Sequence, residues 1–182
     1  MTLSLSPLRW TALALAGAAF ILALVVQFVP FATFSTTIAV PGTSGATADA
    51  DAYVWEAQFD ASFGAEQSSD QTSWYDNDFD DDDGIGMVRA AAPMLVGAGV
   101  LLLVAAVLGL RTATVSAVVA FVGAVVMATA IFLMAQGIKD LFDDQQDWAV
   151  GFWLAIAASV LAAGAGVLGL LGRVRSAPPS AF

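Results

Sequence analysis

The chain has 182 residues, of which 59% are hydrophobic and only 12% are charged, yet its formal net charge is −10. Soluble domains carry roughly 45–50% apolar and about 25% charged residues, so this composition excludes a soluble globular enzyme. An excess of acidic residues without a basic stripe excludes a nucleic-acid-binding protein, and the apolar content excludes a disordered tail. Hydrophobic and charged residues must therefore occupy separate stretches of the chain.

Cysteine and histidine are both absent. Disulfides, thiolate nucleophiles and thiolate metal sites are thereby excluded, and so are the commonest general base and transition-metal ligand. The aspartate-rich, lysine-poor composition is typical of a salt-adapted microorganism.

The first predicted element is a membrane-spanning helix over residues 10–29, after a short N-terminal segment, 1–9. Crossing about 30 Å of hydrocarbon takes roughly 20 apolar residues, which this stretch supplies. The core of a signal peptide is typically 7–15 residues long, and no small-residue cleavage pattern follows Pro30. We therefore predict an uncleaved helix.

Residues 30–89 form a loop that is too long for a simple connector. Its β-branched stretch 33–40 predicts a strand that ends at a Pro-Gly turn, followed by a loose loop over residues 43–50. A second strand is predicted over 52–59, with Tyr53, Trp55 and Phe63 as apolar anchors. Two strands alone are marginal in water. We therefore expect a small antiparallel sheet that is supported by packing onto the ends of the helices.

The second half of this loop, residues 67–84, ends in an acidic run, Asp76–Asp83, that contains six aspartates. Clustered carboxylates suggest calcium, but the EF-hand spacing of glycine and glutamate is not met, and a solvated acidic run is the preferred interpretation. Trp74 and Tyr75, just before the run, are interpreted as interfacial anchors or as a cover for the sheet.

Three more membrane spans are predicted, over residues 90–110, 112–136 and 148–172. Arg111 alone separates the first two, which predicts a tight hairpin, and a short loop, 137–147, precedes the last. Pro93 is expected in the first turn of its helix, where proline costs little. Residues 173–182 form the C-terminal segment.

The distribution of charged residues predicts the orientation of the chain in the membrane. Four of the six basic residues lie on one side of such a four-span chain, and all sixteen acidic residues lie on the other. The basic residues are Arg9, Arg111, Arg173 and Arg175. The positive-inside rule makes their side cytoplasmic. We therefore expect a multi-pass protein of the cell membrane with both termini in the cytoplasm and the loop 30–89 outside.

An ionisable residue inside a membrane span is the usual sign of a transport path. The predicted spans contain no such residue. Gln27 and Gln136 lie near helix ends, where they can contact water or the outer domain. Small residues recur at a spacing of four, which lets helix backbones approach closely, within the chain or against a partner helix. These pairs are Ala12 and Ala16, Ala14 and Ala18, Ala105 and Gly109, Ala162 and Gly166, and Ala165 and Gly169.

This arrangement resembles the claudin-like tetraspan superfamily. The shared features are the long β-rich first outer loop with a tryptophan, here Trp55, the minimal cytoplasmic hairpin and the short second loop. The openings of two helices, 89–92 and 148–153, are also similar to those of claudins. The Gly-Leu-Trp motif and the two cysteines of the family's first loop are missing. The resemblance implies a left-handed four-helix bundle capped by an outer sheet.

The sequence therefore predicts an all-α integral membrane protein, a four-helix bundle with a small extracellular β-sheet formed by the first outer loop. Its expected role is non-enzymatic and structural, a scaffold or accessory subunit acting through the acidic outer domain. The expected partners are the lipid bilayer and another membrane or cell-surface protein, with self-association open. The alternative is a small cation channel or transporter subunit with an acidic outer vestibule. No catalytic, cofactor-binding or metal-binding residue is predicted, and no cofactor.

Overall fold

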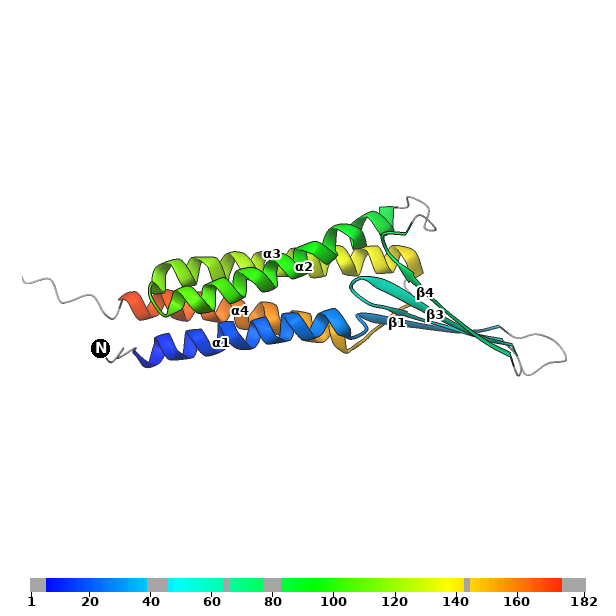
Figure 1. The fold of residues 1–182 in the computed structure, drawn as a ribbon, viewed down its shortest axis with the longest axis horizontal. Coiled ribbons are helices and arrows are strands. Elements are labelled where there is room, and N and C mark those ends of the chain that lie inside the picture. The colour runs from blue at the N-terminus through cyan, green and yellow to red at the C-terminus, as the bar shows by residue number, and fades with distance from the viewer. Residues whose placement is uncertain (1–5, 39–45, 64–65, 77–82, 143–144, 175–182) are drawn as a thin grey trace, which may run out of the picture. The chain divides into compact units, whose positions relative to one another are not determined.

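The computed structural model describes residues 6–38, 46–63, 66–76, 83–142 and 145–174. These residues form four long α-helices, one 3-10 helix and five strands (Figure 1). The helices are α1 (Pro7–Val25), η1 (Val26–Phe28), α2 (Asp83–Gly109), α3 (Ala113–Phe142) and α4 (Val150–Val174). The strands are β1 (Ala32–Ile38), β2 (Ala46–Ala52), β3 (Glu56–Phe63), β4 (Glu66–Ser73) and β5 (Asp147–Trp148).

Each long helix carries an apolar stretch long enough to cross a membrane. Large apolar side chains stay exposed along them, such as Ile21 at 59%, Val107 at 58%, Phe132 at 61% and Val160 at 65% exposure. Lipid tails solvate such side chains as well as a protein core does, whereas water does not. The four predicted apolar helices are confirmed, and they indicate a multi-pass membrane protein.

Two helices are longer than predicted. α2 begins at Asp83 instead of residue 90, and α3 continues to Phe142 instead of ending at residue 136. The prediction placed the start of α2 after Arg89 because a charged residue suggested the membrane boundary. Pro93 consequently lies inside α2, and its predicted place in the first turn was wrong.

The chain divides into two compact units, and α2, α3 and α4 contribute residues to both. The first unit combines the described parts of residues 1–24, 94–128 and 155–182. Its core includes one alanine from each long helix, Ala16, Ala105, Ala120 and Ala165, all at most 3% exposed. Such small side chains let four helix backbones come close together.

Three glycines in this first unit lie where an added side chain would meet a neighbouring helix closely. A Cβ added at Gly169 would lie 2.9 Å from the Ala117 Cβ, and one at Gly166 would lie 3.1 Å from the Ala117 carbonyl oxygen. A Cβ at Gly109 would meet Leu13 of α1. Packing within the chain, one of the two predicted uses of the small-residue spacing, is therefore confirmed for these glycines.

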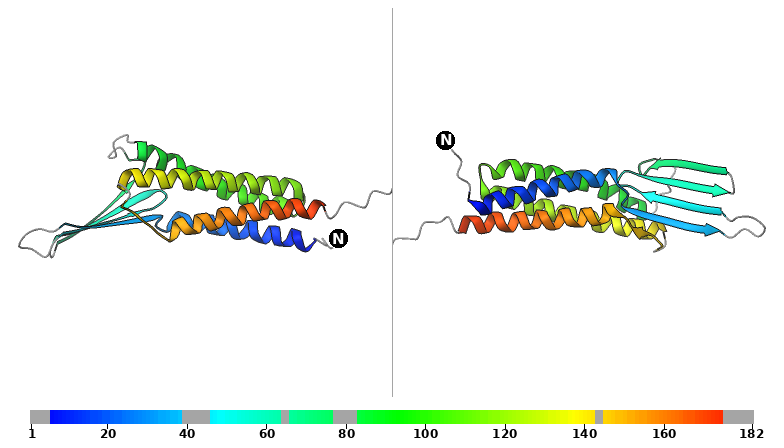
Figure 2. Two further views of the ribbon diagram at one scale, coloured as in Figure 1. Left: turned by 180° about the vertical axis from the view of Figure 1, so that it is seen from behind. Right: turned by 90° about the horizontal axis from the view of Figure 1, so that it is seen from below.

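The second unit combines the described parts of residues 25–93 and 129–154, and it contains the sheet. Its strands are antiparallel in the order β4-β3-β2-β1-β5, and Figure 2 shows β1 to β4 lying side by side. β1 contacts helix ends of the same unit, because the ring of Phe34 stacks on Phe142 at 5.3 Å and the preceding Phe31 meets Phe152 edge-on at 5.6 Å. The backbone N–H of Gly151 also donates to the carbonyl of Pro30 at 2.9 Å.

The small antiparallel sheet was predicted correctly, but its strands were only partly so. The first strand, predicted over 33–40, is confirmed by β1 over its described residues. The loose loop predicted over 43–50 was wrong, because Ala46–Ala52 is β2, and the strand predicted over 52–59 lies four residues later, as β3. β4 and β5 were not predicted at all. Alanine, aspartate, serine and glutamine have low intrinsic strand preference, so pairing with neighbours decides these strands.

Candidate functional site: the two-faced sheet

The register of the sheet separates its side chains into two chemically different faces. Residues opposite one another on neighbouring strands share a face, and successive residues of one strand point to opposite faces. We call one side the polar face; from β1 to β4 it carries Thr33, Ser35, Thr37, Thr47, Asp49, Asp51, Gln58, Asp60, Ser62, Gln67, Ser69 and Gln71. We call the other the apolar face; it carries Ala32, Phe34, Thr36, Ala46, Ala48, Ala50, Ala52, Ala57, Phe59, Ala61, Phe63, Glu66, Ser68, Asp70 and Thr72.

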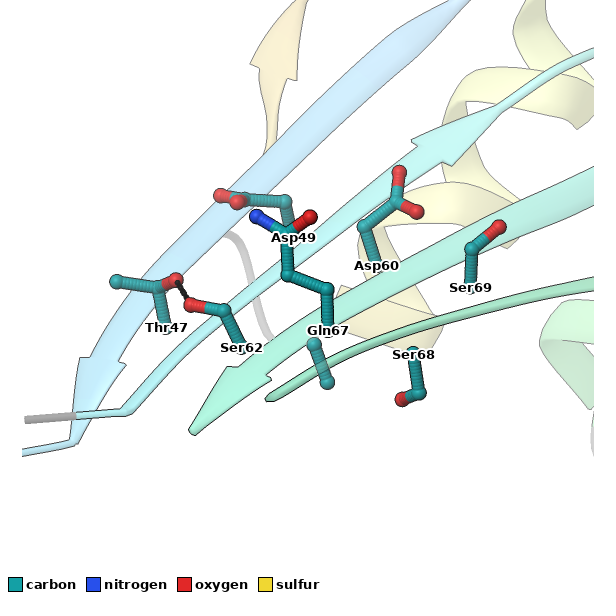
Figure 3. A pocket seen from close by; sticks show the side chains of 8 residues that line it. Thr47, Asp49, Asp60, Ser62, Gln67, Ser68 and Ser69 are labelled. Atoms are coloured by element: carbon teal, nitrogen blue, oxygen red, sulfur yellow. Dashed lines mark hydrogen bonds between the residues drawn. The ribbon is translucent and has the colours of Figure 1, made fainter. Parts of the chain in front are cut away.

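Two aspartates from neighbouring strands lie near the centre of the polar face, with the side chain of Gln67 beside them (Figure 3). Asp49 of β2 is directly opposite Asp60 of β3 in the register. Beside them, the hydroxyls of Thr47 and Ser62 are 2.7 Å apart and share a hydrogen bond. These side chains line an open hollow of about 290 Å³. The hollow is therefore bordered by negative charge and hydroxyl groups.

The pKa of a third carboxyl group on this face, Asp51, is affected by Asp49 and Asp60. Burial raises the pKa of Asp51, and the nearby charges of Asp60 and Asp49 raise it further. Like charges that face one another across strands destabilise the pairing. The polar face thus carries unfavourable charge density.

We expect Asp51→Asn to stabilise the protein at pH 7 by roughly 0.2–1 kcal/mol, the usual size of a like-charge cross-strand term. Because the folded pKa of Asp51 is raised, the folded state binds this proton more tightly than the unfolded state does. Stability from this group therefore rises as pH falls through its folded pKa and is fully gained below about 3.8. Unfolding of the wild type and the variant in mixed micelles at pH 7 and pH 3.5 measures the difference in stability. The advantage of the variant should vanish at the lower pH, and a constant advantage would contradict the electrostatic cause.

The turn after β4 is tied to α2 by Arg89. The Nε of Arg89 donates to the carbonyl of Trp74 at 2.5 Å, and its Nη2 donates to the carbonyl of Asp76 at 3.1 Å. Trp74 is only 1% exposed, and its indole N–H donates to the carbonyl of Tyr53 in the β2–β3 turn at 2.9 Å. Of the two predicted roles of Trp74, a cover for the sheet fits this burial better than an interfacial anchor does.

The predicted anchors of the second strand are mostly exposed. Phe63 is 63% exposed and Trp55 is 37% exposed, so these two predicted apolar anchors are not buried. Trp55 instead donates its indole N–H to the Gln27 side-chain oxygen at 3.0 Å. The expectation that Gln27 contacts water or the outer domain is confirmed by this bond to the β2–β3 turn.

Tyr75 completes a helix hydrogen bond that Pro93 leaves open. Proline has no N–H, so the carbonyl of Arg89, four residues earlier, lacks its usual helical donor. The hydroxyl of Tyr75 donates to that carbonyl at 2.7 Å. Burial raises the pKa of Tyr75, against the lowering effect of Arg89, so the phenol stays protonated and able to donate at neutral pH.

We expect Tyr75→Phe to destabilise the protein by about 1 kcal/mol, the net value of one hydrogen bond. In a Pro93→Ala background the same change should cost less than half as much, because the amide at position 93 can then bond the Arg89 carbonyl. A double-mutant cycle from unfolding in mixed micelles gives the coupling. Equal costs in both backgrounds would show that the hydroxyl does not substitute for the missing amide.

The aspartates at the centre of the polar face were not among the residues that sequence reasoning singled out. That reasoning concentrated on the acidic run Asp76–Asp83, of which residues 77–82 lie outside the described part of the chain. The signal for β2 was present as alternation, because every second residue of Ala46–Ala52 is alanine and the others are Thr47, Asp49 and Asp51. A period of two is the pattern of a strand with one apolar face.

No group of three or more carboxylate, histidine or cysteine side chains is arranged to hold a metal ion within the described residues. Comparison of the chain with protein-family models finds no match, and comparison with curated proteins finds none either. The chemistry of the sheet is therefore the basis for any functional proposal.

Proposed function

We propose that this chain is a non-enzymatic, four-span protein of the cell membrane whose extracellular sheet contacts another membrane or cell-surface protein. The two-faced sheet is the observation that carries the proposal. A sheet that only capped the helices would need one face toward them and a neutral, solvated face outward. This sheet instead presents paired carboxylates on one face and exposed phenylalanines on the other.

The orientation follows from charge. In the first unit, the Arg9 guanidinium donates to the carbonyl of Gly109 at 3.0 Å. This bond brings Arg9 to the α2–α3 turn that contains Arg111, so two of the four basic residues that define the cytoplasmic side share one end of that unit. The positive-inside rule then supports cytoplasmic termini, with the sheet outside.

The interior of the helices favours a contact role over the alternative, a cation channel or transporter subunit. Every buried residue of the described chain is apolar or glycine, with no buried polar or charged residue. Ion paths through membrane proteins are lined by carbonyls, charged rings or polar side chains. Among the described residues, the buried side chains are apolar, which favours helix packing over such a path.

Reconstitution tests the proposal against its alternative. Liposomes that contain the purified full chain alone should show the same potassium and sodium flux as empty liposomes. Cation flux above that background would overturn the contact role and favour the channel.

Photocrosslinking in native membranes tests the contact itself. A photoreactive residue at Ser68, an exposed β4 position on the apolar face, should give one discrete crosslinked protein product. The same group at Val107, an exposed position of α2, is the matched control and should crosslink to lipid. Identical products from both positions would contradict a contact made by the sheet.

A further inference from the structure

The exposed part of the apolar face lies on β3 and β4, at the end of the sheet order. Phe59 and Phe63 are 37% and 63% exposed and are four residues apart on β3, so both point to the apolar face. Aromatic side chains are enriched in the cores of protein–protein interfaces. We call this surface, with its β4 neighbours, the Phe59–Phe63 patch.

A carboxylate lies directly across from each ring. The register pairs Phe59 with Asp70 and Phe63 with Glu66, and both acidic side chains are exposed. Opposite residues of an antiparallel pair share a face, so the two carboxylates flank the patch on the β4 side. These groups are distinct from Asp49 and Asp60, which lie on the polar face.

The row between the two rings consists of the small residues Ala48, Ala61 and Ser68. Four residues of strand separate the rings by about 13 Å, at roughly 3.3 Å per residue. The patch thus combines two exposed rings, a row of small side chains between them, and a carboxylate opposite each ring.

The chemistry of the Phe59–Phe63 patch selects one kind of occupant. A second copy of the chain would bring a net charge of −10 toward two carboxylates. Lipid tails would strip water from the same carboxylates at a high cost. An apolar side chain could contact the small residues between the rings, and basic residues on either side of it could pair with both carboxylates.

The free edge of β4 does not favour simple strand addition at this point. The backbone N–H of Gln71 donates to the Asp70 carboxylate at 2.9 Å, so this edge amide already has an acceptor. A partner would therefore lie across the face, where the rings are.

We infer that the Phe59–Phe63 patch binds an extended segment of another protein in which an apolar side chain is flanked by lysine or arginine, the basic residues being four apart. The inference rests on the proposed contact role and names the face that makes the contact and the chemistry of the partner. Aromatic anchors in a pocket supply most of the affinity at such interfaces, and rim charges supply specificity.

A peptide-binding experiment with the full chain in phosphatidylcholine nanodiscs tests this inference. The probe is a fluorescein-labelled heptapeptide with lysine at positions 2 and 6, leucine at position 4 and serine or threonine elsewhere. Fluorescence anisotropy should show saturable binding, and peptides with glutamate for lysine or serine for leucine should bind at least ten-fold more weakly. Equal binding of the three peptides would overturn the inference.

Variants of the chain locate the binding. Phe63→Ser should weaken the lysine peptide at least ten-fold, and so should the double variant Glu66→Gln, Asp70→Asn. The matched control is Asp49→Asn, Asp60→Asn, which removes the same two charges from the polar face and should change affinity less than two-fold. Equal losses from both double variants would mean that the peptide senses only net charge, which contradicts a site at the patch.

Thiol labelling at position 63 distinguishes the proposed peptide from lipid or a second copy of the chain as the occupant of the patch. The chain has no cysteine, so Phe63→Cys introduces a single thiol. A charged maleimide should label it rapidly in nanodiscs, and the lysine peptide should slow the labelling. Protection without peptide would overturn the inference, in favour of lipid, or of a second copy if the thiols form a disulfide between chains. Failure of peptide binding in liposomes that show no cation flux would reject the patch while leaving the proposed function standing.

Discussion

Gly137→Ala should destabilise the protein by about 1–3 kcal/mol, the usual range for overpacking a tight contact. In the second unit, a Cβ at Gly137 of α3 would lie 2.5 Å from the carbonyl oxygen of Gly84 and 2.8 Å from the Val88 side chain of α2. The oxygen belongs to the backbone, so it cannot rotate away, and the two helices would have to separate. Unfolding of the purified protein in mixed micelles of increasing dodecyl sulfate fraction measures the loss.

Gly86→Ala is the matched control, because it is the same substitution in α2 of the same unit. A Cβ at Gly86 meets no atom within 4 Å. Alanine should be neutral or stabilising there by up to about 1 kcal/mol, since glycine weakens a helix interior. If the two substitutions had the same effect, close contact between α2 and α3 at Gly137 would not be the cause.

Arg89→Met should cost about 2–4 kcal/mol, because it removes two charged hydrogen bonds to backbone carbonyls while keeping most of the apolar stem. The carbonyls of Trp74 and Asp76 would lose the donors that hold the turn after β4 against α2. Hydrogen exchange of the β4 amides should increase together with the loss of global stability.

Arg111→Met makes the identical change at an exposed position in the α2–α3 turn and should alter stability by less than about 0.5 kcal/mol. A similar loss from both variants would point to net charge as the cause. Unchanged exchange of β4 in Arg89→Met would show that the turn is held by other contacts.

The two parts of the chain differ in how far local sequence predicts them. A membrane helix satisfies its own backbone hydrogen bonds, so length and apolar content are enough to predict it. All four helices were found for that reason. The ends of the helices were harder to predict. Arg89, for example, lies inside α2, and its side chain donates hydrogen bonds to carbonyls outside that helix.

The sheet was predicted less well because strands depend on partners far along the chain. β1 is rich in β-branched residues and was found, whereas β4, Glu66–Ser73, carries almost none and is held by β3. The candidate surfaces depend on register in the same way. Asp49 becomes the neighbour of Asp60, and Phe63 the neighbour of Glu66, only once β2, β3 and β4 are paired.

Four apolar helices, a separate acidic segment and the charge asymmetry that predicts orientation can all be recognised in the amino-acid sequence. These properties follow from composition and length, which local chemistry sets. The pairing of distant strands, in contrast, makes alternating alanine and polar residues into a two-faced sheet, and the folded chain brings Tyr75 to the carbonyl that Pro93 leaves without a donor. Both depend on atoms that are distant in sequence, so no local pattern contains them.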